Sequence, residues 1–465
     1  MPNLIETLLD YSNHSNSTHQ YGIIHSARFL KYNYNDSHLK KFLLATNDEV
    51  RLFHASEYSK QILHTFDMKE ADFFRLGVLR KEITANISYD KQRDHSAHTL
   101  YNYLLGCYLY ENSSYVSNAF KASSGLPTCN FVLFTNLWPL TSILHDIGYL
   151  FEGSLFPLSS SIQSDQVRIG SDVINDFYTQ YFWSNCNIYS LENQKKLLEL
   201  AEIDTPYIDK FSLSSVANSL KTLQNPNGLS KALKKEHINI NLSSNAFELW
   251  CQYFEYYNKP TMVDRIKKLQ VFYESQIYYG MSNLGLRILD HGVNSGLLLL
   301  NYNTFYYTLY HSLQMKYSKM NIKDKKICDL FFTDAGGMNM PEYLAKGWWE
   351  DWVRVTAATA LHNFLQSKED ISKYCLAKLS IDEDPFTYIG ILVDIIEEWD
   401  RFNSTPISII TKRLPIQGVD VQIKKLRNSI IEIKYPQKNI AEDVEKELNE
   451  SLLGWDQIIT ISSLN

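Results

Sequence analysis

The sequence predicts a mostly α-helical protein with a small C-terminal α/β module. Three observations predict this class. Apolar residues recur at spacings of three and four through most of the chain, as they do along one face of a helix. Glycine (18 residues) and proline (12 residues), which interrupt helices, are few for a chain of 465 residues. Short runs rich in β-branched residues begin after Asn403.

The composition is that of a globular protein with a sizeable core. Hydrophobic residues make up 45% of the chain and charged residues 21%, which excludes disordered, collagen-like and disulfide-scaffold classes. A chain of this length predicts roughly three structural units. The six cysteines are scattered without a Cys-x-x-Cys pair. We therefore expect reduced thiols in a cytoplasmic protein, rather than a zinc ribbon or an iron–sulfur site.

The helical elements are predicted in order along the chain. Residues 1–90 read as a helical N-terminal region made of several short helices. Residues 91–158 read as two helical segments, joined near Ser124–Pro127 where glycine and proline occur. The more polar residues 161–275 are predicted as a helical insertion. Apolar helices return at residues 276–315, 341–366 and 386–401.

Residues 404–465 are predicted as a separate small α/β module with the order β-β-β-α-β. A turn at Arg427–Ser429 separates the second and third strands, and a charged amphipathic helix at Ile440–Leu453 precedes the last one. The four strands are predicted at Ile407–Thr411, Val419–Lys424, Ile430–Lys434 and Gln457–Ser462.

One uncharged stretch has the length of a membrane span. Residues Ala122–Leu144 carry no charge, but prolines and asparagines interrupt them, and His145 and Asp146 follow directly. We therefore expect a buried helix that leads to a polar site. Residues Met1–Leu9 lack the basic and apolar regions of a secretory signal, so we expect no membrane association.

Histidine and aspartate occur at several places in otherwise apolar helical surroundings. His98 lies on an apolar helical stripe, so its imidazole is expected to point into the core. The pair His145-Asp146 follows the end of the uncharged stretch, and Asp394 is a solitary charge in an apolar helix. His291 and His362 have similar apolar surroundings.

These residue types together favour a divalent metal site. A carboxylate is costly to bury unless it is paired or binds a metal ion. Imidazoles and carboxylates that converge on one core can share one or two cations, and mixed nitrogen and oxygen coordination suits Mn, Mg, Fe, Co, Ni or Zn. Such an ion lowers the pKa of a bound water and neutralises phosphoryl oxygens, which is the chemistry of phosphate-ester hydrolysis.

The order of these residues resembles the signature of the HD-domain superfamily of metal-dependent phosphohydrolases, which is a histidine, a His-Asp pair and a distant aspartate. Arg93-Asp94-His95-Ser96-Ala97-His98 is similar to the first metal helix of that family, and Leu144-His145-Asp146-Ile147-Gly148-Tyr149 to its central motif. Three further motifs are similar to a bacterial subgroup with extra histidines: Asp290-His291-Gly292, Leu361-His362-Asn363 and Val393-Asp394.

The resemblance covers residues 91–160 and 280–402, and it implies an HD-type helical core at residues 91–160 and 276–403. The ligands that it implies for a first metal ion are His98, His145, Asp146 and Asp394. His291 and His362 would complete a second site, as in the related HD-GYP phosphodiesterases. The implied catalytic residues are Asp146, which can bridge two ions, and His95. The implied substrate-binding residues are Arg93, Asn363 and Arg401.

Structural roles remain open for several of these residues. His95 and His98 lie on the same helix face, so His95 is either a rival ligand or a group that grips a substrate phosphate. Asp394 can instead form a buried ion pair with Arg401. His291 and His362 can be core histidines that hydrogen-bond to a backbone carbonyl or to a metal-binding carboxylate.

We expect the substrate to be a phosphate ester of a small nucleotide. The net charge of −7 gives no basic track for a long polyanion, so nucleic acid is not favoured. Leu150 stands where the proline of a GYP triplet would be, so a cyclic-di-GMP enzyme is not implied. Two alternatives remain, an HD nuclease acting on single-stranded DNA or RNA and a non-catalytic nucleotide-sensing scaffold. The native metal and the oligomeric state, a homo-oligomer included, are left open by the sequence.

Overall fold

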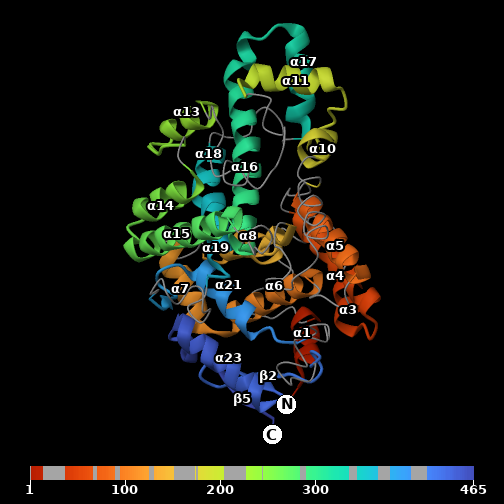
Figure 1. Ribbon diagram of the computed structural model, residues 1–465, viewed down its shortest axis with the longest axis vertical. Helices are drawn as coiled ribbons and strands as arrows, with labels where there is room; N and C mark the ends of the chain where they lie inside the picture. The colour runs from red at the N-terminus through yellow and green to blue at the C-terminus, as the bar shows by residue number, and fades with distance from the viewer. Residues whose placement is uncertain are drawn as a thin grey trace. The chain divides into compact units, whose positions relative to one another are not determined.

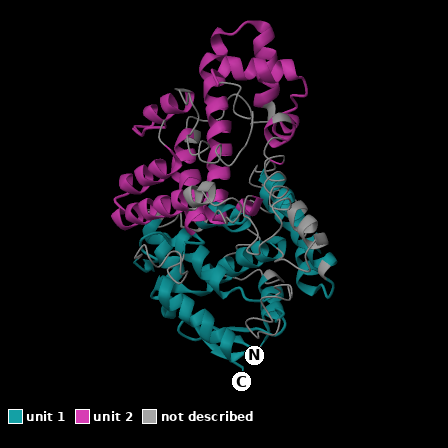
Figure 2. Cartoon of the chain, viewed as in Figure 1, with its two compact units in different colours: residues 1–146, 362–465 teal, residues 147–361 magenta. Residues whose placement is uncertain are grey.

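Helices dominate the structure, which confirms the predicted class. The computed structural model describes residues 2–13, 37–65, 71–88, 95–124, 130–150, 173, 176–203, 227–242, 245–282, 290–334, 343–364, 377–399 and 416–464. Residue contacts divide the chain into two units (Figure 2): unit 1 contains residues 1–146 and 362–465, and unit 2 contains residues 147–361. The four regions predicted from the sequence remain a prediction.

Unit 1 is built around one buried helix, α6 (His95–Asn112), in which every residue from His95 to Tyr110 is buried. This helix packs against the neighbouring helices α4, α8 and α21 (Figure 1). The other helices of the unit surround these four. The helices are α1 (Leu4–Asn13), α3 (Ser37–Leu44), α4 (Asp48–Thr65), α5 (Ala71–Ser88), α7 (Ser114–Ser124), α8 (Asn130–Leu144) and α21 (Pro385–Ile396).

The crossing of α6 and α8 is close because Gly106 of α6 has no side chain. A Cβ atom at this position would overlap the buried ring of Trp138 in α8. The indole nitrogen of Trp138 donates a hydrogen bond to the carbonyl oxygen of Tyr103 at 3.0 Å, which fixes the ring against α6. Pro139 lies inside α8 and does not end it. The segment predicted as a single helix before Ser124 is divided into α6 and α7 at Ser113.

The C-terminal residues of unit 1 form the predicted small α/β arrangement. Its three-stranded sheet has the order β2 (Gln422–Lys425), β3 (Ile431–Tyr435), β5 (Ile459–Ser463), with β2 and β3 antiparallel and β3 and β5 parallel. The helix α23 (Lys438–Ser451) packs against β3 and β5. The short strands β1 (Leu379–Ser380) and β4 (Leu452–Leu453) pair in parallel, and a 3-10 turn follows at Trp455–Gln457. The predicted strand Ile407–Thr411 lies outside the described residues.

This α/β part is joined to the helices of unit 1 and to the N-terminus. The hydroxyl of Tyr435 in β3 donates a hydrogen bond to the carbonyl oxygen of Ile396, the last residue of α21, at 2.5 Å. The hydroxyl of Tyr388 in α21 donates to the carbonyl oxygen of Leu453 at 2.9 Å. The backbone nitrogen of Leu4 donates to Val421 at 2.7 Å. The module that the sequence predicts as separate therefore belongs to the same unit as α21.

Unit 2 is organised along its longest described helix, α16 (His291–Lys316). Asp290 caps its N-terminus, accepting a hydrogen bond from the backbone nitrogen of Val293 at 2.9 Å. The helix packs against η2, α11, α13, α19 and η6. The other elements are η2 (Ile147–Leu150), η3 (Phe177–Tyr181), α10 (Phe182–Asn185), α11 (Leu191–Ala201), α13 (Asn227–Lys235), α14 (Ala246–Tyr256), α15 (Pro260–Ser282), η5 (Tyr317–Lys319), α17 (Ile322–Asp334), α18 (Tyr343–Gly347), η6 (Trp348–Trp352) and α19 (Val353–Leu361).

The uncharged stretch that mimics a membrane span includes the helix α8. This helix has 15 residues, fewer than the roughly 20 that cross a bilayer. None of the helices in the described part of the chain combines the length and the apolar character that a membrane crossing needs.

Candidate metal centre

His98 is placed in the core of unit 1 by the burial of α6. Its Nδ1 atom lies 2.6 Å from the carboxylate atom Oε2 of Glu397, and both side chains are buried. A carboxylate accepts hydrogen bonds only, so Nδ1 carries the hydrogen in this pair. The opposite ring nitrogen, Nε2, is directed toward the carboxylates of Asp394, at 2.9 Å, and Asp146, at 3.6 Å. A buried histidine thus lies among three carboxylates.

His145 and Asp146 lie in the turn that follows the last residue of α8. The Nδ1 atom of His145 is 2.6 Å from the carbonyl oxygen of Ser142, and it must carry the hydrogen in that bond. Burial lowers the pKa of His145 to about 3; the carboxylate of Asp146 opposes this shift, and His362 and His98 add to it. The ring is therefore neutral at pH 7 in the absence of a metal ion, and its Nε2 atom carries a lone pair.

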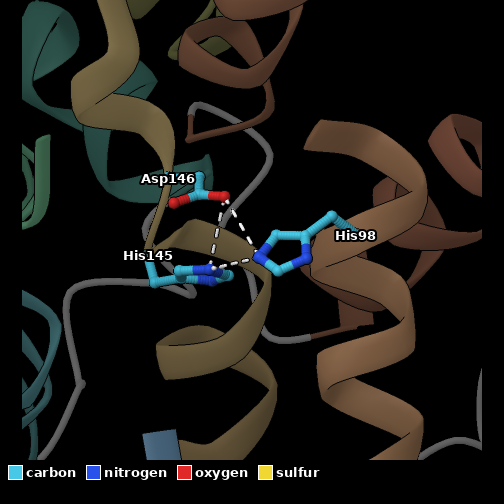
Figure 3. A group of neighbouring side chains, drawn as sticks. All are labelled: His98, His145 and Asp146. Atoms are coloured by element: carbon cyan, nitrogen blue, oxygen red, sulfur yellow. Dashed lines mark hydrogen bonds and ion pairs between the residues drawn. The ribbon is translucent and has the colours of Figure 1, made fainter. Parts of the chain in front are cut away.

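The functional atoms of His98, His145 and Asp146 meet at one place (Figure 3). The two Nε2 atoms are 3.3 Å apart, and Oδ2 of Asp146 lies 3.3 Å from that of His145. Ligand atoms of all three residues lie within 4.8 Å of one another, and all three side chains are buried. Lone pairs and negative charge at such distances repel one another unless a cation lies between them.

Asp394 reaches this group from α21. The helix begins at Pro385 and is capped by Asp384, whose carboxylate accepts a hydrogen bond from the backbone nitrogen of Thr387 at 2.9 Å. Most of its residues are apolar and buried, and the helix packs against α6. Asp394 is the least buried of the four predicted ligands of the first ion, and its contact with His98 joins it to the others.

Sequence reasoning did not identify Glu397 or Asn102 as site residues. The predicted helix extends to residue 401, but α21 ends at Ile396, and the chain then turns so that Glu397 meets His98. Asn102 lies four residues after His98 on α6, and its Nδ2 atom is 3.1 Å from Nε2 of His98. Their spacing in the sequence could have indicated them, because residues three or four apart lie on the same face of a helix. Glu397 follows Asp394 by three residues, and Asn102 follows His98 by four.

The two predicted ligands of a second ion lie in different units. His362 belongs to unit 1, where its Nε2 atom is 3.7 Å from Oδ1 of Asp146 and its ring centre is 4.6 Å from that of His145. His291 is the first residue of α16 in unit 2, and its ring stacks on Tyr149 at a centroid distance of 4.0 Å. A second site that uses both histidines remains a prediction.

Of the four remaining predicted residues, His95 and Asn363 lie in the described part of the chain. His95 is buried at the start of α6 but is not among the residues whose ligand atoms meet. Asn363 is buried in the turn that contains His362. Arg93 and Arg401 lie outside the described residues, so their predicted substrate contacts and the ion pair between Asp394 and Arg401 are untested.

The donor set could hold a metal ion. Two imidazole nitrogens and two carboxylates would provide mixed nitrogen and oxygen coordination. The Nδ1 atom of each histidine is hydrogen-bonded to an acceptor, which is Glu397 for His98 and the carbonyl oxygen of Ser142 for His145. This is the usual support for metal-binding histidines in proteins, because it holds the ring and directs the other nitrogen at the ion.

Comparison with known proteins finds no significant match to this chain. No protein-family model matches the chain, and no curated protein or solved structure matches it significantly. Its function is therefore inferred from its own residues.

Proposed function

We propose that this chain is a metal-dependent phosphohydrolase of the HD type, acting on a phosphate ester of a small nucleotide. The observation that carries the proposal is the buried meeting of His98, His145 and Asp146, with Asp394 in contact with His98. These are the four residues that the motif resemblance selects, and they come from three places in the sequence. A buried set of acceptor atoms is stabilised by a divalent cation.

The residues around the ion would have separate tasks. His98, His145, Asp146 and Asp394 would bind the ion, and Glu397 and the Ser142 carbonyl would hold the two imidazoles in the required tautomer. A divalent ion bound there would supply an activated water and would neutralise charge on phosphoryl oxygens. Asp146 also lies close to His362, so its two oxygens face different histidines.

The choice of a small nucleotide is supported by charge. The chain carries 52 acidic and 45 basic residues, and long nucleic acids are bound mainly through clustered lysine and arginine. A small phosphate ester needs only the ion and a few local donors. The choice of reaction is supported by the donor set, because water activation and charge neutralisation serve hydrolysis of phosphate esters.

A hydrolysis screen tests the proposal. The purified chain is supplied with Mn²⁺ or Mg²⁺ and is offered nucleoside triphosphates, cyclic nucleotides and single-stranded oligonucleotides. We expect turnover of a mononucleotide, which falls to background in Asp146→Asn and is unchanged in Asp382→Asn, a variant of an exposed carboxylate of unit 1. Preferential cleavage of the oligonucleotides with strong salt dependence would instead identify a nuclease. Tight nucleotide binding without turnover would identify a non-catalytic sensor.

A further inference from the structure

Asn102 is a buried amide beside the group His98–His145–Asp146. It lies on α6 one turn after His98, and 1% of its surface is exposed. Its Nδ2 atom is 3.1 Å from Nε2 of His98 and 3.5 Å from Nε2 of His145. One amide nitrogen therefore faces the same ring nitrogens that are assigned above to metal binding.

The hydrogen-bond partners of the two histidines determine which of their ring nitrogens face Asn102. The Nδ1 atoms of both rings carry hydrogens, since they face Glu397 and the Ser142 carbonyl. The Nε2 atom of His145 is then an acceptor, and Nε2 of His98 faces both Asn102 and the carboxylate of Asp394. The NH₂ group of Asn102 lies against both Nε2 atoms, at the place that the proposed metal ion would occupy.

The oxygen atom of the same amide makes no corresponding hydrogen bond. The Oδ1 atom of Asn102 is buried and has no hydrogen-bond partner among the described residues. A buried carbonyl oxygen without a hydrogen-bond partner is destabilising. Half a turn about the terminal side-chain bond exchanges the amide nitrogen and oxygen with little change of shape. The exchange would place an oxygen lone pair where the NH₂ group now faces the two histidines.

We propose that Asn102 is a further ligand of the metal centre, with its amide NH₂ bonded to the histidines when the ion is absent and its amide oxygen bonded to the ion when it is present. The inference rests on the proposed metal site of His98, His145 and Asp146. An NH₂ group and a cation cannot occupy the same place, so metal binding requires the amide to turn. An amide oxygen is an ordinary ligand for divalent cations.

Two substitutions of Asn102 give opposite expectations. Asn102→Asp supplies a charged oxygen and is expected to bind Mn²⁺ about tenfold more tightly. Asn102→Leu keeps the branched shape but removes the oxygen, and it is expected to bind Mn²⁺ about tenfold more weakly, within the range that supporting groups of metal sites contribute. Thr99→Val is the matched control, because it removes a buried hydroxyl from the same helix whose bond goes to the Ser96 carbonyl.

The measurement is calorimetric titration of the metal-free full-length chain with Mn²⁺, with circular dichroism to confirm that each variant is folded. Cobalt absorption spectra provide a second readout, since loss of an oxygen ligand changes the d–d bands. Equal or tighter binding by Asn102→Leu would overturn the inference, because an amide that only obstructs the empty site should favour binding when it is removed. His145→Ala distinguishes a failure of the Asn102 proposal from a failure of the proposed metal site. If His145→Ala binds Mn²⁺ as the wild type does, the proposed metal site is wrong.

Discussion

At the scale of single residues, Glu397 is the group that determines what His98 can do. Its carboxylate is 1% exposed and lies 2.6 Å from Nδ1 of His98. A buried carboxylate is costly without a partner, so each side chain stabilises the other. The contact holds a hydrogen on Nδ1, so Nε2 is the ring nitrogen that would bind the proposed metal ion. Glu397 is thus a positioning residue of the site.

This role makes a prediction for Glu397→Ala. Without the carboxylate, His98 can take the other tautomer, in which a hydrogen on Nε2 opposes metal binding. We expect the affinity for Mn²⁺ to fall by about 10- to 100-fold, as for other supporting groups of metal-binding histidines. Glu397→Gln should lose less, because its amide oxygen still accepts from Nδ1. The affinities are measured by calorimetry beside Glu398→Ala, a change at the next residue; an affinity in Glu397→Ala equal to that of Glu398→Ala would refute the role.

The residues that meet in the candidate site could be predicted from the sequence, and the residues that contact them could not. His98, His145 and Asp394 are conspicuous because charged or titratable groups are rare in apolar helices. Glu397 is adjacent to another glutamate, and Asn102 is an uncharged amide, so neither stands out locally. Their roles depend on which ring nitrogen of His98 they meet. That information lies in a contact between residues 299 positions apart.

At the scale of elements, the close crossing of α6 and α8 sets the distance between His98 and His145. Gly106 and Trp138 form the contact point, where no Cβ atom can be accommodated. His98 lies on α6, and His145 directly follows α8, so a change at the crossing is transmitted to the distance between their Nε2 atoms, which is 3.3 Å.

Gly106→Ala is therefore expected to damage both stability and metal binding. Trp138 is fully buried and cannot move aside freely, so overpacking should cost about 1–3 kcal/mol in the free energy of unfolding. Gly347→Ala is the matched control, because its Cβ would have only an ordinary contact with Asp351 in a helical segment. There the change should stabilise by about 0.5–1 kcal/mol. Urea denaturation measures both variants; equal effects would show that the crossing is not tightly packed.

Element types are easier to predict than their ends. The turn at Arg427–Ser429 and the strands on either side of it match the described structure, since alternating apolar residues and a turn are local signals. The position at which α21 ends, Ile396, is not indicated by a local sequence signal. Its terminal carbonyl accepts the hydroxyl of Tyr435, which lies 39 residues later. Long-range bonds of this kind also place the C-terminal sheet in unit 1, whereas composition alone predicts a separate module.

At the scale of the whole molecule, buried histidines link stability to pH. Burial lowers the pKa of His311 in unit 2 to about 4, below its ordinary value of 6.5. Because the folded state binds the proton less readily than the unfolded state, stability is full above about pH 6.5 and falls as the pH drops toward 4. His145 acts in the same direction in the metal-free protein.

Between pH 7.5 and pH 5 we expect His311 to contribute at most about 2 kcal/mol to this loss. Urea denaturation of the metal-free chain at pH 7.5 and pH 5 measures it. The variant His311→Gln should lose less stability between the two pH values than the wild type. His237→Asn, a change of an exposed histidine with a left-handed backbone that asparagine tolerates, should not alter the difference. A pH dependence of His311→Gln identical to that of the wild type would exclude this contribution.

The division into two units divides the predicted ligands of the second ion but not those of the first. The predicted ligands of the first ion, together with Glu397, Asn102 and His362, all lie in unit 1. His291 lies in unit 2 with its cap Asp290 and the stacked ring of Tyr149. Sequence periodicity predicts the helices of both units, but not this division, because the division depends on which helices pack together. A helical fold hosts many functions, so the residues of the site carry the functional proposal.

Unit 1 is proposed to hold a divalent metal ion at His98, His145, Asp146 and Asp394. Calorimetric titration of the metal-free chain with Mn²⁺ tests it most directly, with the double variant His145→Ala/Asp146→Ala as the comparison and circular dichroism as the check on folding. The wild type should bind at least one ion per chain, and the folded double variant should bind none at this site. Equal binding by the two proteins, or no binding of Mn²⁺, Co²⁺ or Zn²⁺ by the wild type, would contradict the claim.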